Sequence, residues 1–411
     1  MSPVRTAPAA LTADDSALRT RYLAEVLELL YPAPCRTGGE PGETIADYYV
    51  VPDARRPRLL VPSTSRKVAA AAVRRYAEPQ SRTARLKRDA VVAALRTGAS
   101  AVLLRDRIRV TGPRSGSIDG YLREALGREL SVSIHIGPAR ANRKPVLQLI
   151  GPDGETFGFG KLGTGPLTQR LVRAETNALI ALGRSGLTKL TVPSVLHAGQ
   201  WRGLQVLIQS ALPVWLPRAP LTRRRLAGAM LDIAACCGCS TGTLAGGTYW
   251  TDLRGRLAAL GDRAEGAALG GAVEQLVRHA GDTTLRYGSW HGDWAPWNMA
   301  NLTDALLVWD WERFAQGAPF GFDAVHHDLQ RRLQSTGDAA GAVEATVRAA
   351  GEVLAPFGVA PEARELTALL YLADLAARYL TDRQAEAGAR LGVLGTWLLP
   401  VLIRRVEELS K

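Results

Sequence analysis

The chain has 411 residues, 46% of them hydrophobic and 22% charged, and this composition indicates a folded globular protein with two or three domains or lobes. Four cysteines in a chain of this length exclude a disulfide framework, and the longest apolar stretch, near the C-terminus, is too short for a membrane span and contains a proline. The net charge is +12, and the first residues lack an apolar segment of signal-peptide length, so we expect a cytoplasmic protein.

The first 125 residues are expected to form an accessory α/β module that carries no chemistry. Its patterns predict helices and short strands over the ranges 14–32, 47–52, 58–63, 65–77, 81–98 and 101–110. Residues 51–110 hold fifteen Lys or Arg against four Asp or Glu, which is most of the net charge. The block has a single aromatic residue and matches no nucleic-acid-binding motif, so we read it as solvated helix faces and expect no nucleic-acid partner.

From residue 126 the pattern changes to short alternating segments. Three successive strands, a helix and two further strands are predicted at 131–137, 145–151, 156–163, 167–186, 194–201 and 204–212. Residues 214–411 are mostly helical in pattern. The sequence therefore predicts an α+β protein with two lobes, a small antiparallel sheet over 126–213 and a helical lobe over 214–411.

The stretch SWHGDWAPWNMANLTDALLVWDWE, residues 289–312, contains five of the nine tryptophans beside several polar groups. Two strand-like runs flank a turn at 303–305, and a hairpin folded there would place Asn298 roughly opposite Asp310. Asp293 lies five residues before Asn298 in a short loop. Two carboxylates and an amide oxygen would then converge.

Such a group of oxygens suits Mg²⁺, and a carboxylate kept off the metal can orient a hydroxyl and accept its proton. Phosphoryl transfer requires this arrangement, together with a cation on the nucleotide phosphates. Lys161, at the end of the third strand, and Glu175, in the following helix, are the candidates for that cation and its partner.

The strings HGDWAPWN and VWDWE, with the strand lysine and helix glutamate upstream, resemble the aminoglycoside phosphotransferase and choline kinase group of the protein-kinase-like fold. The resemblance covers residues 130–330 and implies ATP and Mg²⁺ as cofactors. It implies that Asp293 is the catalytic base, that Asn298 and Asp310 bind the metal, that Lys161 contacts phosphates and that Glu175 orients the lysine. The adenine would meet the hinge backbone, which comprises Gln209, Ser210, Ala211, Leu212 and Pro213. His291 would brace the catalytic loop.

The turn at 136–145 departs from the resemblance because it holds one glycine. Arg140, Asn142, Arg143 or Lys144 are candidates for the phosphate cover, with solvated turn residues as the alternative. Glu312 is either a metal neighbour or part of an ion pair. Trp294 and Trp297 either stack on a substrate or pack in the core, and core packing is favoured.

We therefore expect a kinase that phosphorylates a hydroxyl of a small molecule such as a sugar, an amino sugar or a related metabolite. A cationic antibiotic would require an acidic cleft, and no dense acidic run follows residue 214. Two alternatives stay open. One is a kinase for a peptide or protein docked by the N-terminal module, and the other is a nucleotide-binding scaffold without turnover that acts through the basic N-terminal block.

Overall fold

The computed structural model describes residues 13–38, 42–76, 82–98, 104–137, 141–387, 389 and 391–410. They form two compact units, of which the first comprises Met1–Ala139, Arg143–Val172 and Val195–Ala211, and the second Arg140–Asn142, Arg173–Ser194 and Leu212–Lys411. Within the described ranges, no helix combines the length and the apolar character needed to cross a membrane.

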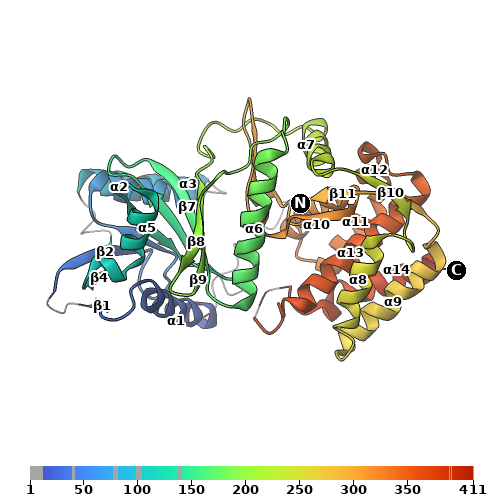
Figure 1. The fold of residues 1–411 in the computed structure, drawn as a ribbon, viewed down its shortest axis with the longest axis horizontal. Helices are drawn as coiled ribbons and strands as arrows, with labels where there is room; N and C mark the ends of the chain where they lie inside the picture. Colours follow the sequence, from blue (N-terminus) through green and yellow to red (C-terminus); the bar gives the residue numbers. More distant parts are fainter. Residues whose placement is uncertain are drawn as a thin grey trace, which may run out of the picture. The chain divides into compact units, whose positions relative to one another are not determined.

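A nine-stranded sheet, antiparallel throughout, forms the centre of the first unit, in the order β1-β4-β2-β3-β5-β6-β7-β9-β8 (Figure 1). Its strands are β1 (Arg36–Thr37), β2 (Thr44–Val51), β3 (Leu59–Pro62), β4 (Arg107–Thr111), β5 (Ser131–His135), β6 (Val146–Ile150), β7 (Thr156–Gly163), β8 (Val195–Trp201) and β9 (Leu204–Ser210). The five strands predicted between residues 131 and 212 are all present as β5 to β9, and they lie next to one another.

The N-terminal strands continue the same sheet. Leu59 and Leu60 of β3 pair with His135 and Ile134 of β5. Helices also surround the sheet, namely α1 (Ala13–Leu30), α2 (Arg66–Tyr76), α3 (Arg82–Thr97) and α5 (Ile118–Leu126), with a 3₁₀ turn η1 (Arg114–Gly116) before α5. Whether residues 1–125 form a module that folds alone stays a prediction.

The side chains of β3 point alternately to the two faces of this sheet, and both faces are covered. Leu60 packs in the core that contains α1 and α5 side chains, whereas Leu59 and Val61 pack with α2 and α3. Successive side chains of a strand point to opposite faces, so one short apolar strand serves two cores. Apolar residues on both faces therefore keep β3 inside the sheet rather than at a solvated surface.

The second unit is mostly helical, as predicted, and Figure 1 shows its helices packed beside one another. Its helices are α7 (Arg223–Ala235), α8 (Thr248–Ala258), α9 (Ala264–Ala280), α10 (Phe322–Ser335), α11 (Ala339–Arg348), α12 (Ala350–Leu354), α13 (Arg364–Thr381) and α14 (Leu399–Leu409). Helix α6 (Pro166–Arg184) begins in the first unit and continues in the second from Arg173. Short 3₁₀ helices are η2 (Pro296–Asn298), η3 (Trp311–Arg313), η4 (Ala355–Phe357), η5 (Pro361–Ala363) and η6 (Leu394–Thr396).

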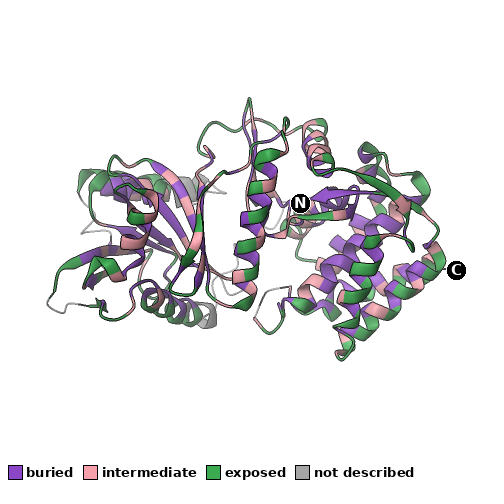
Figure 2. Cartoon of the chain, in the orientation of Figure 1, coloured by how far each residue is buried: buried purple, intermediate pink, exposed green. Residues whose placement is uncertain are grey.

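Helix α13 is the centre of this unit. All residues from Leu366 to Ala377 are buried, on every side of the helix (Figure 2). A helix that is apolar all round is stable only when other helices enclose it. Two small sheets complete the unit, β10 (Ser240–Thr243) with β11 (Thr284–Trp290) and β14 (Ala315–Pro319), and β12 (Met299–Asn301) with β13 (Leu306–Val308).

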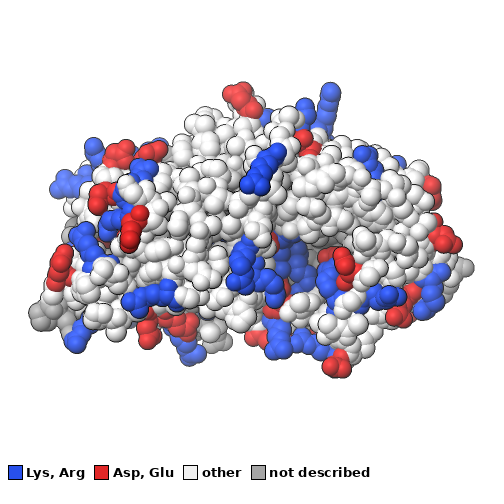
Figure 3. All heavy atoms as spheres, viewed as in Figure 1, with Lys and Arg blue, Asp and Glu red and all other residues white. Residues whose placement is uncertain are grey.

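The basic residues of the N-terminal block do not form a continuous face in the view of Figure 3, where blue and red side chains alternate over the first unit. Several of these arginines have acidic partners. Arg107 pairs with Asp47, and Arg88 lies 3.1 Å from Asp89. This distribution agrees with the interpretation of the block as solvated helix and strand surface.

Candidate active site

The hairpin predicted in the quoted stretch is present as β12 and β13, but its register differs by one residue. Met299 pairs with Val308, and the Trp309 amide donates a hydrogen bond to the Asn298 carbonyl at 3.0 Å. Asn298 therefore lies opposite Trp309 rather than Asp310. The difference arises at the turn, where the Leu302 amide bonds the Ala305 carbonyl and shifts the centre by half a residue.

Asp310 follows the hairpin in the left-handed region, with φ 73° and ψ 54°. Aspartate tolerates this conformation better than most residues, and outliers of this kind concentrate at functional sites. The conformation allows η3 to begin immediately, at Trp311. Trp311 is fully buried, and its indole N–H donates to the Val308 carbonyl at 3.1 Å.

Asp293, the predicted catalytic base, is held by two neighbours. Asn298 Nδ2 donates to the Asp293 carbonyl at 2.9 Å and to the Asp293 carboxylate Oδ2 at 3.0 Å. His326 Nε2 lies 3.0 Å from the other carboxylate oxygen, Oδ1, which is within hydrogen-bonding distance although the two groups are not well aligned. The Asp293 side chain is still 33% exposed, so one part of the carboxylate faces open space.

Burial raises the pKa of Asp293, but His326 and the positive charge of Arg378 outweigh it, and the net pKa is lowered. The carboxylate is therefore ionised near neutral pH. An ionised carboxylate of this kind can accept a hydrogen bond from a hydroxyl and orient it.

His291 is fully buried and fixes the loop that carries Asp293. Its Nδ1 accepts the Asp293 amide hydrogen at 3.1 Å, and its Nε2 lies 3.1 Å from the Trp309 carbonyl, which can only accept. The ring is therefore neutral with its proton on Nε2, in agreement with a pKa lowered to about 4, chiefly by burial. These contacts suit the bracing role that the resemblance implies for His291.

Asp323, at the start of α10, holds the same loop from the other side. Its carboxylate accepts the amide hydrogens of His291 at 2.8 Å and Gly292 at 3.1 Å. Gly292 has φ 80°, and a Cβ there would lie 2.3 Å from the Arg313 carbonyl, so the loop requires glycine at this position. Burial raises the pKa of Asp323 to about 7, although both amides lower it.

A second group of polar side chains is acidic. Carboxylate oxygens of Glu175, Asp310 and Glu312 lie within 4.8 Å of one another. Glu175 also accepts the Trp311 amide hydrogen at 3.2 Å, and Glu312 accepts from Asn142 Nδ2 at 2.9 Å. Three carboxylates at this separation repel one another, and a hard divalent cation bound by oxygen ligands would relieve that repulsion.

The acidic cluster suits Mg²⁺ by its donor type and its spacing. Of the two predicted metal ligands, Asp310 belongs to the cluster. Asn298 does not belong to it; its amide nitrogen donates to Asp293, so its side-chain oxygen is the atom that could bind a metal. The cluster adds Glu175, which the sequence assigned to Lys161, and Glu312, whose role the sequence left open.

Lys161 and the hinge residues belong chiefly to the first unit. Lys161 is 6% exposed on β7 and pairs with Val146 of β6 and Leu207 of β9. Gln209 and Ser210 end β9, and Gln209 Oε1 is buried with no hydrogen-bond partner among the described residues. The Ala211 amide already donates to the Phe157 carbonyl at 2.9 Å. The phosphate contact of Lys161 and the adenine contacts of 209–212 stay predictions.

The turn residues proposed for the phosphate cover have separate positions. Arg140 lies outside the described residues. Asn142 bonds Glu312, and the Arg143 guanidinium lies 3.7 Å from the centre of the Tyr22 ring. Stacking on Tyr22 gives Arg143 a structural contact within the first unit, and the phosphate cover stays a prediction.

The tryptophans of the motif include both buried and exposed side chains, whereas core packing was expected. Trp290, Trp294 and Trp311 are buried, and they form the rigid wall behind the loop. Trp297 is 43% exposed, so the expectation of core packing is wrong for this residue. It lies in η2, whose sharp turn between Pro296 and Asn298 leaves the indole outside the core.

Three functional candidates were missed by the sequence analysis. His326 contacts Asp293, and its Nδ1 lies 2.8 Å from the hydroxyl of Tyr371 on α13. Arg378 donates from Nη1 to the Gly292 carbonyl at 2.5 Å. Tyr371 and Arg378 are seven residues apart, two helical turns, and so lie on one face of α13. That spacing is a signal in the sequence, but nothing local connects it to the catalytic loop.

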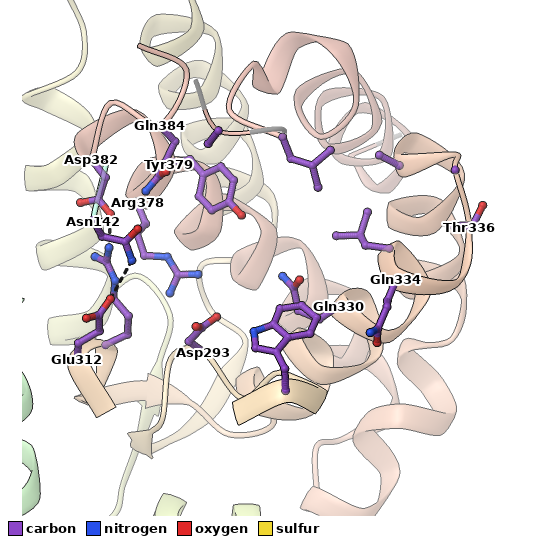
Figure 4. A pocket seen from close by; sticks show the side chains of 17 residues that line it. Asn142, Asp293, Glu312, Gln330, Gln334, Thr336, Arg378, Tyr379, Asp382 and Gln384 are labelled. Carbon is purple, nitrogen blue, oxygen red and sulfur yellow. Dashed lines mark hydrogen bonds and ion pairs between the residues drawn. The ribbon is translucent and has the colours of Figure 1, made fainter. Parts of the chain in front are cut away.

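Of these candidates, Arg378 lines a cavity of about 350 Å³ in the second unit, and Asp293 lies in the wall of the same cavity. Figure 4 shows Asp293 and Gln330 on its lower side, Arg378 and Tyr379 above, and the bonded pair Asn142 and Glu312 to the left. The volume is within the range of small-molecule sites.

No family model and no curated protein matches this chain. Solved structures do resemble it. A thermostable mutant of aminoglycoside phosphotransferase APH(4)-Ia is 15% identical, with a TM-score of 0.46 over 70% of this chain and 99% of that one. A putative fructosamine-3-kinase from Thermobifida fusca YX-ER1 is 19% identical, with a TM-score of 0.40 over 72% and 99%. Aminoglycoside phosphotransferase APH(3'')-Id from Streptomyces rimosus is 17% identical, with a TM-score of 0.38 over 62% and 96%.

Two of these structures are aminoglycoside phosphotransferases, which are among the proteins that the motifs resemble. At TM-scores below 0.5 and identities below 20%, they assign neither an activity nor a substrate to this chain.

Proposed function

We propose that this chain is an ATP- and Mg²⁺-dependent phosphotransferase that phosphorylates a hydroxyl group of a small molecule. The observation that carries the proposal is the position of Asp293. Its ionised carboxylate borders a cavity of about 350 Å³, and its two oxygens are fixed by Asn298 and His326. This is the group that the reaction needs beside the acceptor.

In the proposed reaction the acceptor hydroxyl donates a hydrogen bond to Asp293. Its oxygen attacks the γ-phosphorus of ATP, a new O–P bond forms, and the bond from phosphorus to the ADP oxygen breaks. The hydroxyl proton passes to Asp293 late in the transition state and then to solvent, because an aspartate of low pKa is a weak base until the oxygen becomes acidic. ADP leaves with the electron pair of the broken bond.

The residues that would hold Mg²⁺ are Glu175, Asp310 and Glu312, with the Asn298 carbonyl oxygen as a further ligand. The ion would supply positive charge to the phosphate oxygens as the ADP leaves. Lys161 would add a second positive charge on the phosphates, and Gln209 to Leu212 would meet the adenine, as the resemblance implies.

The experiment for this function is an acceptor screen that measures ADP release with Mg²⁺ and ATP. The proposal predicts release that requires Mg²⁺ and falls by about 100-fold or more in Asp293→Asn, since positioned proton acceptance is typically of that size. Release that is independent of both Mg²⁺ and Asp293 would reject the proposal.

A further inference from the structure

The cavity beside Asp293 also carries information on what the acceptor is. Its lining comes from η2, η3, α10, α13 and the segments that follow α10 and α13. Five of the lining residues are carboxylic acids or arginines, namely Asp293, Glu312, Arg313, Arg378 and Asp382. A cavity selects its ligand through polar groups that still lack a partner. Which class of ligand fits therefore depends on whether each of these charged side chains already has a partner in the protein.

The carboxylates of this lining are already engaged. Asp382 pairs with Arg313, and its side chain is 3% exposed. Glu312 accepts from Asn142 and lies in the acidic cluster. Asp293 is held by Asn298 and lies within the field of Arg378. Among the described residues of the lining, Asp293 and Asp382 therefore have positively charged neighbours, and Glu312 belongs to the acidic cluster proposed to hold the metal.

The remaining polar groups are neutral. Gln330 and Gln334 lie four and eight residues after His326 on α10, so these three side chains share one face of that helix. Gln384 and Thr336 add further uncharged groups. An amide both donates and accepts hydrogen bonds, which matches a hydroxyl, because a hydroxyl does the same.

Trp297 supplies an apolar surface in the same lining, and it is 43% exposed although the rest of the motif is packed. An exposed indole in a catalytic loop has no role in the core, so its surface is available to a ligand. Large aromatic faces bind the apolar side of ring compounds.

We propose that the acceptor is a neutral, polyhydroxylated ring compound, a sugar or cyclic polyol, whose hydroxyls bond Gln330 and Gln334 and whose apolar face lies on Trp297. This inference rests on the proposed phosphotransferase activity. A polycationic amino sugar would need carboxylates without partners, and the Arg378 guanidinium would repel it. An anionic acceptor would meet the ionised Asp293 and the phosphates of ATP.

The test measures kcat/KM by ADP release for three sets of acceptors. The sets are neutral hexoses, disaccharides and cyclitols, the corresponding 2-amino sugars, and polycationic aminoglycosides. The inference predicts that the best neutral acceptor exceeds its own 2-amino counterpart by about 10-fold or more, since a mismatched charge in a partly enclosed site costs at least that much. A preference for the amino sugars or the aminoglycosides overturns it.

Two variants test whether the preference for neutral acceptors arises from this cavity. Gln330→Glu adds an unpaired carboxylate of almost the same shape, so it should lower kcat/KM for neutral acceptors by about 10-fold and raise it for the 2-amino sugars. Trp297→Ala should raise KM for neutral acceptors by about 10-fold with little change in kcat. Gln275→Glu, on helix α9, is the control and should change neither value. An unchanged preference in Gln330→Glu overturns the assignment.

Failure of this inference is distinguishable from failure of the proposed function. Slow hydrolysis of ATP by water needs Mg²⁺ and Asp293 but no acceptor. If that hydrolysis is present and every neutral compound fails to accelerate it or to bind in ligand-observed NMR, the acceptor class is wrong. If hydrolysis and transfer are both absent from the intact protein, the phosphotransferase proposal is wrong.

Discussion

His326 Nε2 lies 3.0 Å from Asp293 Oδ1, and the other ring nitrogen of His326 lies 2.8 Å from the hydroxyl of Tyr371. The histidine is fully buried, and burial lowers its pKa although Asp293 raises it. A neutral ring placed in this way orients one carboxylate oxygen while Asn298 orients the other. The Asp293 carboxylate is thus positioned from two helices, α10 and α13, that follow its loop in the sequence.

Replacement of His326 tests this positioning. We expect His326→Gln to lower kcat by about 10-fold with a smaller change in the KM for ATP, because it alters the orientation of the base and not the nucleotide site. Tyr371→Phe, which removes only the hydroxyl that holds the ring, should give a smaller loss. His279→Gln, at an exposed position of α9, serves as the control. Equal kcat values in all four proteins would exclude the positioning role.

From the acidic cluster we expect Glu312→Gln to raise thermal stability without Mg²⁺ and to reduce the gain in stability that Mg²⁺ gives. Without metal the variant should be more stable, since one of three mutually repelling charges is gone, while the amide oxygen still accepts from Asn142. With Mg²⁺ the intact protein should gain more stability than the variant, because a ligand stabilises the state that binds it. Melting temperatures with and without Mg²⁺ measure both effects.

Asp304→Asn is the matched control for that experiment, because Asp304 is exposed in the turn of the neighbouring hairpin. It should leave the response to Mg²⁺ unchanged. Identical responses in Glu312→Gln and the intact protein would contradict a metal site at the cluster.

Asp323 predicts a pH dependence of stability. Its pKa is raised from an ordinary 3.8 to about 7 in the folded protein, chiefly by burial, so the folded state binds this proton more tightly than the unfolded state. The contribution of Asp323 to the free energy of unfolding should therefore fall between about pH 4 and pH 7 by about 4 kcal/mol and stay constant above. Denaturation of Asp323→Asn across this range should lack that fall. A fall of the same size in both proteins would show that another group causes it.

Removal of residues 1–125 tests the predicted accessory module. Strand β3 pairs with β5, and the side chains of Tyr48, Val50 and Leu60 share a core with Ile134. A chain that starts at residue 126 would expose this apolar surface and an open sheet edge, so we expect it to aggregate. Size-exclusion chromatography and circular dichroism measure the outcome. A soluble, folded product that retains ATP hydrolysis would show that the N-terminal part is dispensable.

The parts of the fold that the sequence predicted well depend on local signals. Strands β5 to β9 follow from alternation and turn residues, and the hairpin at 299–308 follows from two apolar runs around a polar turn. The continuity of β3 with β5 was not predicted, because pairing between strands seventy residues apart has no local pattern. The register of the hairpin was wrong by one residue because it depends on how the turn closes.

The candidate site shows the same division. Asp293, Asn298 and Asp310 were found because they lie close together in the sequence, and Asp293 and Asn298 are bonded in the structure. His326 was missed, since its contact with Asp293 requires α10 to pack against the loop that carries Asp293. The assignment of Glu175 to Lys161 stays a prediction, whereas the contact of Glu175 with the Trp311 amide was not predicted, because it depends on a tertiary approach that no spacing reveals.

The most direct measurement compares the rate of ADP release by the intact protein with that of Asp293→Asn, in the presence of Mg²⁺, ATP and the best acceptor. The ATP concentrations are chosen so that ATP occupies the same fraction of both proteins. The account predicts a loss of about 100-fold or more in kcat, with Asp282→Asn, an exposed control, at the intact rate. Equal rates in Asp293→Asn and the intact protein would contradict the account. Tight ATP binding without release in either protein would favour a nucleotide-binding scaffold.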